Sequence, residues 1–246
     1  MGLLARRIPA RRGAGDPPGD RRLPQPEPQH VHQDGERKPR ALIGLLAALV
    51  FILALPVRAD DDLINPDRPG IADGSQTIGR GTFQLETGID RQQGDNAFPT
   101  LLRYGLSKNF EARLESDSAL THPLLGFKWH FAGAPSLGVI VRAGEQHEGD
   151  VRLAADINLG EKWSLNPNIG VNRDRGALGA LTIQYNVTQR ANVFIDGGYD
   201  TSQLLLDAGG AWIIGRNTQL DASITWGARG AGVPNVVYSA GISRRF

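Results

Sequence analysis

Residues 81–91 read GTFQLETGIDR, and apolar and polar side chains alternate along the segment. The two faces hold Phe83, Leu85, Thr87 and Ile89, and Gln84, Glu86, Gly88 and Asp90. A period of two is the pattern of a β-strand whose two faces meet different environments. The segment therefore predicts a strand with one apolar and one polar face, and the rest of the chain repeats this pattern.

Alternating segments of about ten residues, separated by turn signals, follow one another along the chain. The clear segments are 81–91, 110–117, 123–131, 151–159, 163–172 and 219–226, and the weaker ones are 97–106, 136–145, 178–187, 190–199, 203–214 and 236–246. No window shows sustained helical periodicity. The chain is therefore predicted to be all-β with about 12 strands, an even number that fits a barrel with both termini on the periplasmic side.

A soluble β-sandwich would also alternate, and two further features decide between the folds. Sandwich strands usually run about five or six residues, whereas a tilted membrane strand needs about 9–11. The polar faces also carry charges of both signs, which a barrel lumen accepts and a lipid-facing position penalises by about 2–4 kcal/mol. We therefore predict an antiparallel up-and-down transmembrane β-barrel over residues 81–246.

The charged positions on the polar faces are the candidate functional residues. We predict that the lumen is lined by Glu86, Asp90, Arg103, Glu111, Arg113, Glu115, Lys128, Arg142, Arg152 and Asp156. Their charges could set the selectivity of a passage for small solutes, or they could form a structural lattice of ion pairs that fills the barrel. An interior is just filled at about 8 strands and open at about 16–18, so both interpretations remain.

The start of the chain predicts export. The apolar run 41–55 follows Arg37, Lys38 and Arg40 and ends at Val57-Arg58-Ala59. This arrangement is typical of a cleavable signal peptide, here 37–59 with cleavage after Ala59, and the run is short for a spanning helix of about 20 residues. The alternative is an uncleaved anchor. We predict that the chain is exported through this signal peptide and is located in the bacterial cell outer membrane.

Two polar segments flank the predicted signal peptide. Residues 1–36 are rich in Pro, Arg, Gly and Gln and are predicted to be a disordered extension; the alternative is that translation starts within them, at Val31. Residues 60–80 form an N-terminal periplasmic segment with Pro66 and Pro69. This segment either enters the barrel, where Asp67 and Arg68 could pair with lumen charges, or remains a solvated tail.

The composition excludes several classes of function. Residues 1–59 hold 10 Lys and Arg against 5 Asp and Glu, whereas residues 60–246 hold 17 against 21, so the mature part offers no basic stripe for nucleic acid. There is no cysteine, and the histidines lack metal-ligand spacing. We predict no cofactor, no metal and no enzymatic activity. The alternative of a barrel-embedded lipid enzyme would rest on His122 near Ser116 and Ser118.

The last segment, VVYSAGISRRF over 236–246, resembles the terminal strand of bacterial outer-membrane proteins, which ends in an aromatic residue and is read by the barrel assembly machinery. On this resemblance Tyr238, Ile242 and Phe246 are the assembly signal. Arg244 departs from the pattern and could extend into the membrane interface. The resemblance implies the assembly machinery and outer-membrane lipid as partners.

A second resemblance concerns the first part of the mature chain. The runs NPDRPG over 65–70, GRGTFQLETG over 79–88, LRYGLS over 102–107 and LGFKW over 125–129 resemble outer-membrane transporters grouped under the meta-pathway of phenol degradation. The resemblance implies a barrel that passively transports small, aromatic or hydrophobic molecules. The alternatives are a structural or surface-interaction barrel with a blocked lumen and the lipid enzyme described above.

Overall fold

The computed structural model describes residues 63–116, 123–133, 135–144, 149–173, 176–200, 203–228 and 235–246. The predicted extension, the signal peptide and its cleavage site lie outside these ranges, as do His122 and Ser118. Within the described part of the chain, no helix is long and apolar enough to cross a membrane.

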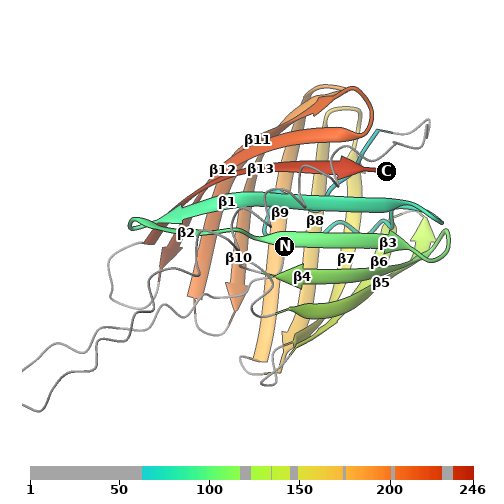
Figure 1. Ribbon diagram of the computed structural model, residues 1–246, viewed down its shortest axis with the longest axis horizontal. Helices are drawn as coiled ribbons and strands as arrows, with labels where there is room; N and C mark the ends of the chain where they lie inside the picture. The colour runs from blue at the N-terminus through green and yellow to red at the C-terminus, as the bar shows by residue number, and fades with distance from the viewer. Residues whose placement is uncertain are drawn as a thin grey trace, which may run out of the picture. The chain divides into compact units, whose positions relative to one another are not determined.

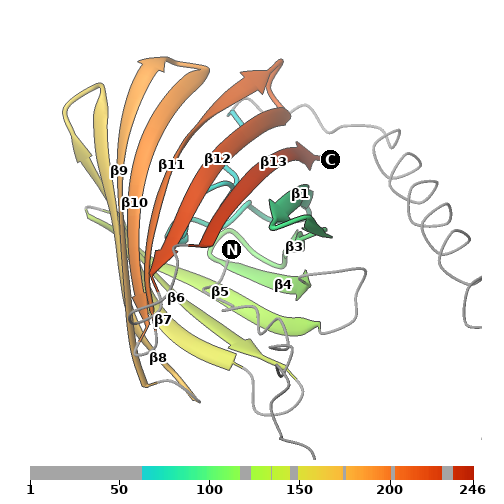
Figure 2. The ribbon, with the colours of Figure 1, turned by 90° about the vertical axis from the view of Figure 1, so that its left-hand side faces the viewer.

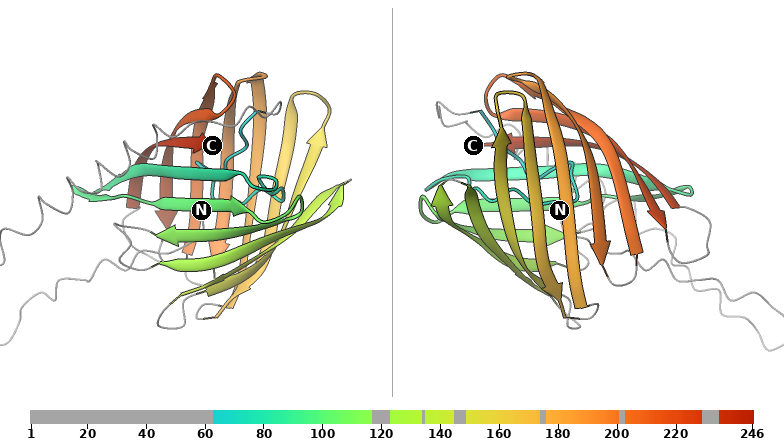
Figure 3. Two further views of the ribbon diagram at one scale, coloured as in Figure 1. Left: turned by 45° about the vertical axis from the view of Figure 1, so that its right-hand side comes forward. Right: turned by 180° about the vertical axis from the view of Figure 1, so that it is seen from behind.

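Thirteen strand segments form one antiparallel sheet. They are β1 (Phe83–Gln92), β2 (Asp95–Ala97), β3 (Thr100–Gly105), β4 (Phe110–Ser116), β5 (Leu124–Gly133), β6 (Ser136–Ala143), β7 (Gly149–Leu159), β8 (Trp163–Asn172), β9 (Gly176–Thr188), β10 (Ala191–Asp200), β11 (Gln203–Ile214), β12 (Thr218–Ala228) and β13 (Asn235–Arg245). From β3 onward each strand pairs with the next, and β13 pairs with β1, so the sheet closes into a barrel (Figures 1 and 3).

Two of these segments act as one strand of the barrel. A two-residue turn with positive φ at Gln93 and Gly94 joins β1 to β2, as expected for a tight hairpin. Pro99 follows β2, and because proline has no amide hydrogen to donate, it interrupts the ladder before β3 continues along β1. With β2 and β3 counted together, the barrel has 12 strands, and the prediction of a 12-stranded antiparallel barrel is confirmed.

The outward face of the barrel is an apolar surface. Leu125 and Ile169 are 64% and 67% exposed, and Trp129, Trp163, Trp212 and Trp226 all point outward. Trp129, Trp163 and Trp212 lie near the end of the barrel that carries Phe83 and Phe246, which we call the termini end. So large an exposed apolar surface is unusual for a soluble monomer and is what a lipid-facing barrel presents.

The inward face is polar and encloses residues 63–80, which we call the lumen segment. This segment enters at the termini end, where Ile64 N donates to Arg216 O over 2.8 Å, and returns to the same end, where Thr77 Oγ1 donates to Lys108 O over 2.7 Å. Between these points Asp67, Arg68, Asp73 and Ser75 are buried inside the wall, where Figure 2 shows the segment in cyan. The alternative of a solvated tail is therefore wrong for residues 63–80.

Candidate functional site

Strands β1 and β3–β7 form the charged wall of the lumen. Alternation puts their polar residues inward, and neighbouring strands bring acid and base together: Arg103 bonds Glu86 at 3.0 Å and Glu111 at 2.9 Å. The series continues by pairs of 3.1 Å or less through Arg113, Glu115, Arg142, Asp150 and Arg152. These residues, together with Lys128, form the charged ladder, and every member is buried.

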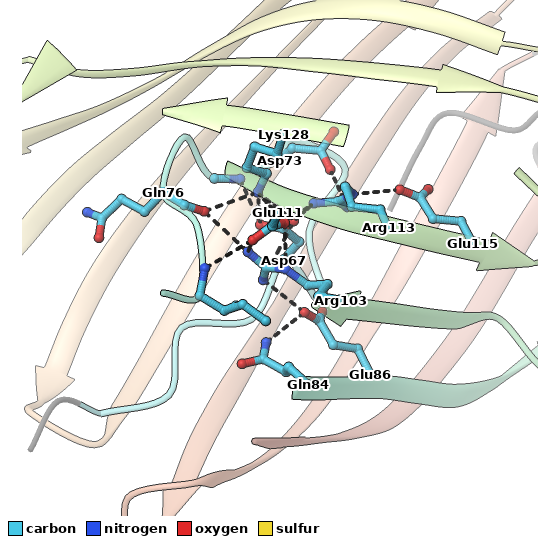
Figure 4. Close-up of polar contacts among 12 residues, drawn as sticks. Asp67, Asp73, Gln76, Gln84, Glu86, Arg103, Glu111, Arg113, Glu115 and Lys128 are labelled. Atoms are coloured by element: carbon cyan, nitrogen blue, oxygen red, sulfur yellow. Dashed lines mark hydrogen bonds and ion pairs between the residues drawn. The ribbon is translucent and has the colours of Figure 1, made fainter. Parts of the chain in front are cut away.

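Asp67 of the lumen segment binds the first part of the ladder (Figure 4). Lys128 Nζ lies 3.0 and 2.8 Å from its two carboxylate oxygens, and Arg113 Nη1 donates to the same carboxylate. Burial alone would raise the pKa of Asp67, but Arg103, Lys128 and Arg113 hold that pKa well below its usual range. The nearest wall carboxylate to Lys128 is Glu111, at 4.0 Å. Lys128 therefore depends on the lumen segment for its closest partner.

Asp73 repeats this arrangement further along the ladder. Its carboxylate accepts from Arg142 Nη2, from Arg152 Nη1 at 3.1 Å and from Arg113 Nη2 at 3.4 Å. Asp73 is fully buried. Asp67 and Asp73 thus each lie within 4.0 Å of three cationic side chains of the wall, and Arg113 is common to both sets.

Strands β8–β12 form the opposite, cation-free wall, because none of them contains lysine or arginine. Here the lumen segment offers donors: Arg68 Nη2 bonds Asp221 at 3.0 Å, and the amide of Ile71 donates to Asp196. Asn168 joins the backbone of Asp73 by two bonds of 2.9 and 3.0 Å. The consecutive residues Asp67 and Arg68 therefore form ion pairs with opposite walls: Asp67 with cations of the charged wall, and Arg68 with Asp221 of the cation-free wall.

Glycines in the wall make room for the lumen segment. Gly88 of β1 and Gly241 of β13 are direct partners at the closing seam of the barrel. A Cβ built on Gly241 would lie 2.4 Å from Arg68 Nε, and one on Gly138 of β6 would lie 2.4 Å from the carbonyl oxygen of Ser75. Side chains at these sites would collide with the segment, so the wall is shaped to hold it.

A cavity of 1020 Å³ separates the lumen segment from the cation-free wall at the termini end. Its amide and hydroxyl lining comes mainly from adjacent strands and includes Asn158, Ser164, Asn166, Gln184, Asn186 and Asn192. Ile64, Phe194 and Ile213 also contribute. This cavity therefore borders mainly the cation-free wall and reaches β5–β7 at His130, Ser136 and Asn158.

All ten residues predicted to line the lumen lie on the inward face. Eight belong to the charged ladder, and the other two serve elsewhere: Asp90 accepts from Ser239 Oγ at 2.7 Å, and Asp156 accepts from Ser75 and Asn166. Their role in a passage stays a prediction. Sequence reasoning missed Asp73 and Asp150. The signal for Asp150 was its place two residues before Arg152, on the same face of a strand.

The predicted assembly signal lies at the seam and beyond it. Phe246 is buried, its amide donates to Phe83 O over 2.8 Å, and the two rings are 5.7 Å apart. Tyr238 is 58% exposed on the outward face. Arg244 Nη1 donates to Thr218 Oγ1 over 3.2 Å, and its guanidinium lies 5.7 Å from the Phe246 ring. Recognition by the assembly machinery stays a prediction.

Among the described residues, no group of three His, Cys, Asp or Glu side chains could hold a metal ion. Ser116 is buried at the end of β4, while its suggested partners in the lipid-enzyme alternative lie outside the described ranges. The described residues therefore provide no geometric support for the lipid-enzyme alternative.

No family model and no curated protein matches the chain. Among solved structures, the barrel is similar to the KdgM porin, with a TM-score of 0.55 and 11% identity over 66% of this chain and 99% of that chain. It is also similar to the COG4313 outer membrane channel from Pseudomonas putida F1, with a TM-score of 0.50 and 12% identity over 74% of this chain and 100% of that one.

The NanC porin gives a TM-score of 0.50 and 8% identity over 65% of this chain and 98% of that chain. At such identities the similarity shows the fold, which this chain shares with outer-membrane porins and channels. The resemblance to the phenol meta-pathway transporters stays a prediction.

Proposed function

We propose that the protein is a channel of the bacterial outer membrane that lets small molecules pass without an energy source. The observation that carries the proposal is the 1020 Å³ cavity along the cation-free wall, which leaves polar space beside the lumen segment. Solutes would pass between this wall and the segment. The apolar outward face supplies the contact with lipid.

Export through a signal peptide cleaved after Ala59, and insertion guided by the Phe246 strand, belong to the same proposal. Both termini of the barrel would then lie on the periplasmic side, so the termini end and its cavity would face the periplasm. The lumen segment would be the part of the mature chain that narrows the channel from that side.

The cargo is a separate matter from the channel. KdgM has been solved in complex with disordered oligogalacturonate. In this chain the ladder cations that could meet an acidic saccharide already bind wall carboxylates, Asp67 and Asp73. The aromatic or hydrophobic cargo implied by the family resemblance stays a prediction, and swelling of proteoliposomes in phenol against glycerol would test it.

A second candidate function is favoured by the lumen segment itself. The buried ion pairs of the lumen segment could hold it permanently in the lumen. The protein would then be a structural or surface-interaction barrel with a blocked lumen. The charged ladder is the lattice of ion pairs that such a barrel would need.

Single-channel recording in planar bilayers separates the two candidates. The purified mature chain is expected to give discrete, low-conductance openings. A chain lacking residues 63–78 serves as the reference for an emptied lumen, provided that it still shows the heat-dependent gel mobility of a folded barrel. Absence of both conductance and solute flux in the mature chain, with conductance in the shortened chain, would establish the blocked barrel instead.

A further inference from the structure

The cavity lining repeats one kind of chemistry over adjacent strands. Ser164 of β8 is the cross-strand partner of Gln184 of β9, and Asn186 of β9 is the partner of Asn192 of β10. Asn158 of β7 is in turn the partner of Ser164. Because direct partners in a sheet lie close together, their side chains form one continuous amide and hydroxyl surface.

Part of the hydrogen-bonding capacity of this surface is used within the wall. Gln184 Nε2 donates to Asn186 Oδ1 over 2.9 Å, and Asn166 Nδ2 donates to Asp156 Oδ1 over 2.6 Å. A primary amide has two donors and an acceptor oxygen with two lone pairs. The Gln184 oxygen and the Asn186 amino group therefore keep capacity for an occupant of the cavity.

A further polar atom at the cavity comes from the other wall. His130 of β5 lines the cavity, and its Nδ1 is buried with no hydrogen-bond partner among the described residues. The protein encloses this ring nitrogen, so an occupant's hydroxyl group would satisfy it only after a shift of the imidazole ring. His130 and the amide surface thus face the same space from opposite sides of the barrel.

The charges around the cavity argue against charged solutes. Strands β8–β12 carry no cation, and the residues of β5–β7 that line the cavity include no lysine or arginine. The side chain of Arg68 is engaged by Asp221. Arg190 lines the cavity from an exposed turn at its rim. The carboxylate of Asp156 is already bonded by Ser75 and Asn166. Neither an anion nor a cation would find a buried partner that is not already engaged.

Part of the apolar lining is also engaged, although Leu63, Ile157 and Ile213 are only half-buried. Ile64 is 2% exposed and Phe194 6% exposed, so the surrounding protein already covers most of both side chains. The surface left to an occupant is dominated by amides and hydroxyls, which both donate and accept. Hydroxyl groups have the same dual character. A volume of about 1020 Å³ lies just above the roughly 300–1,000 Å³ of small-molecule sites, so the cavity has room for a solute of several rings.

We propose that this cavity is a binding site for a neutral, polyhydroxylated solute of saccharide size. The assignment rests on the proposed channel function and specifies its cargo. Gln184, Asn186 and Asn192 bind the solute from the cation-free wall, and His130 binds it from the charged wall.

Calorimetric titration of the detergent-solubilised mature protein tests the assignment with three probes: maltotriose, the acidic trigalacturonate and phenol. Maltotriose is expected to bind at least about tenfold more tightly than either of the others. The carboxylates of trigalacturonate would lose water without gaining a buried free cation, and phenol offers the amide surface only one hydroxyl group. The variant Gln184→Ala/Asn186→Ala should weaken maltotriose binding by about tenfold, from the loss of two hydrogen-bonding side chains.

Asn96→Ala is the matched control, because Asn96 is an exposed amide in the hairpin at the other end of the barrel. If the double variant fails the gel-mobility test for folding, Asn192→Ala replaces it. The assignment is wrong if maltotriose does not bind, if trigalacturonate or phenol binds as tightly, or if the wall variant binds maltotriose like the control. Conductance of the same sample is recorded in parallel: channels without maltotriose binding contradict this inference alone, and binding without conductance contradicts the channel.

Discussion

The two walls of the lumen differ in what they require from the lumen segment. The charged wall of β1 and β3–β7 holds five cations, and it meets the segment through the carboxylates of Asp67 and Asp73. The cation-free wall of β8–β12 meets it through Arg68, backbone amides and Asn168. The first wall fixes the segment by charge, and the second leaves a neutral cavity beside it. One barrel thus combines a wall that is joined to the segment by a network of ion pairs with a wall that borders a cavity at the termini end.

Removal of both carboxylates of the lumen segment should have the largest effect, because it takes away the ion pairs that join the segment to the charged wall. In Asp67→Asn/Asp73→Asn, the buried Lys128, Arg142 and Arg152 lose partners, at about 3–5 kcal/mol for each broken buried pair. The lumen segment should leave the barrel and become sensitive to protease, with raised conductance. Limited proteolysis followed by mass spectrometry measures this.

The control for that variant is Asp95→Asn, an exposed carboxylate in the β1–β2 hairpin. A double variant whose lumen segment stays as protected as in the control would show that the ion pairs do not hold the segment.

A side chain at the closing seam should have a smaller effect. Gly241→Leu would place a Cβ 2.4 Å from Arg68 Nε and force the guanidinium away from Asp221. Overpacking of this kind costs about 1–3 kcal/mol. The midpoint of heat-dependent gel mobility should fall relative to Gly133→Ala, because Gly133 has no atom within 4 Å of its would-be Cβ. Equal midpoints would contradict the tight seating of Arg68.

A single charge placed on the cation-free wall sharpens the comparison. Gln184→Lys adds a cation to the cavity, so the reversal potential in a salt gradient should shift toward anion selectivity while the barrel remains folded. Asn96→Lys adds the same charge outside the cavity and should shift the reversal potential much less. A shift of the same size in both variants would place the conducting path elsewhere.

Mild acid should have the smallest effect. Arg103, Lys128 and Arg113 hold the pKa of Asp67 well below its ordinary 3.8. A carboxylate with a lowered pKa stabilises the folded arrangement at neutral pH and loses this contribution only as the pH falls through its folded pKa. Protease protection of the lumen segment around Asp67 should therefore be unchanged between pH 7 and about pH 5. Release of the segment within this range would contradict the pairing of Asp67.

The strands were predictable because a period of two reports directly which side chains share a face. Boundaries such as those of β8 and β11 follow from that pattern and the turns around them. Pro99 is visible in the sequence. That it divides one barrel strand into β2 and β3 could be known only once both were seen to pair with β1. The inward position of the ten charged residues followed from the same alternation.

The contents of the lumen were not predictable in the same way. Alternation shows that Lys128 and Arg142 share the inward face but not which residue covers them, since their partners Asp67 and Asp73 lie far away in the sequence. In the sequence, Gly88 and Gly241 look like ordinary strand glycines. Only the structure shows that the side chain of Arg68 lies against both of them. The amide surface of the cavity emerges only when β7–β10 are aligned in register.

The position of the lumen segment is tested most directly by a disulfide between the segment and the wall. Ser75 Oγ and Ser136 Oγ are 2.7 Å apart, and the chain has no cysteine of its own. In Ser75→Cys/Ser136→Cys, mild oxidation should form a disulfide in nearly every molecule, seen by mass spectrometry as loss of both free thiols. The pair Ser75→Cys/Ser107→Cys, with the second thiol in an exposed turn, should not form one. Two free thiols in the first variant, both labelled by a maleimide in the folded barrel, would show that the segment does not lie in the lumen.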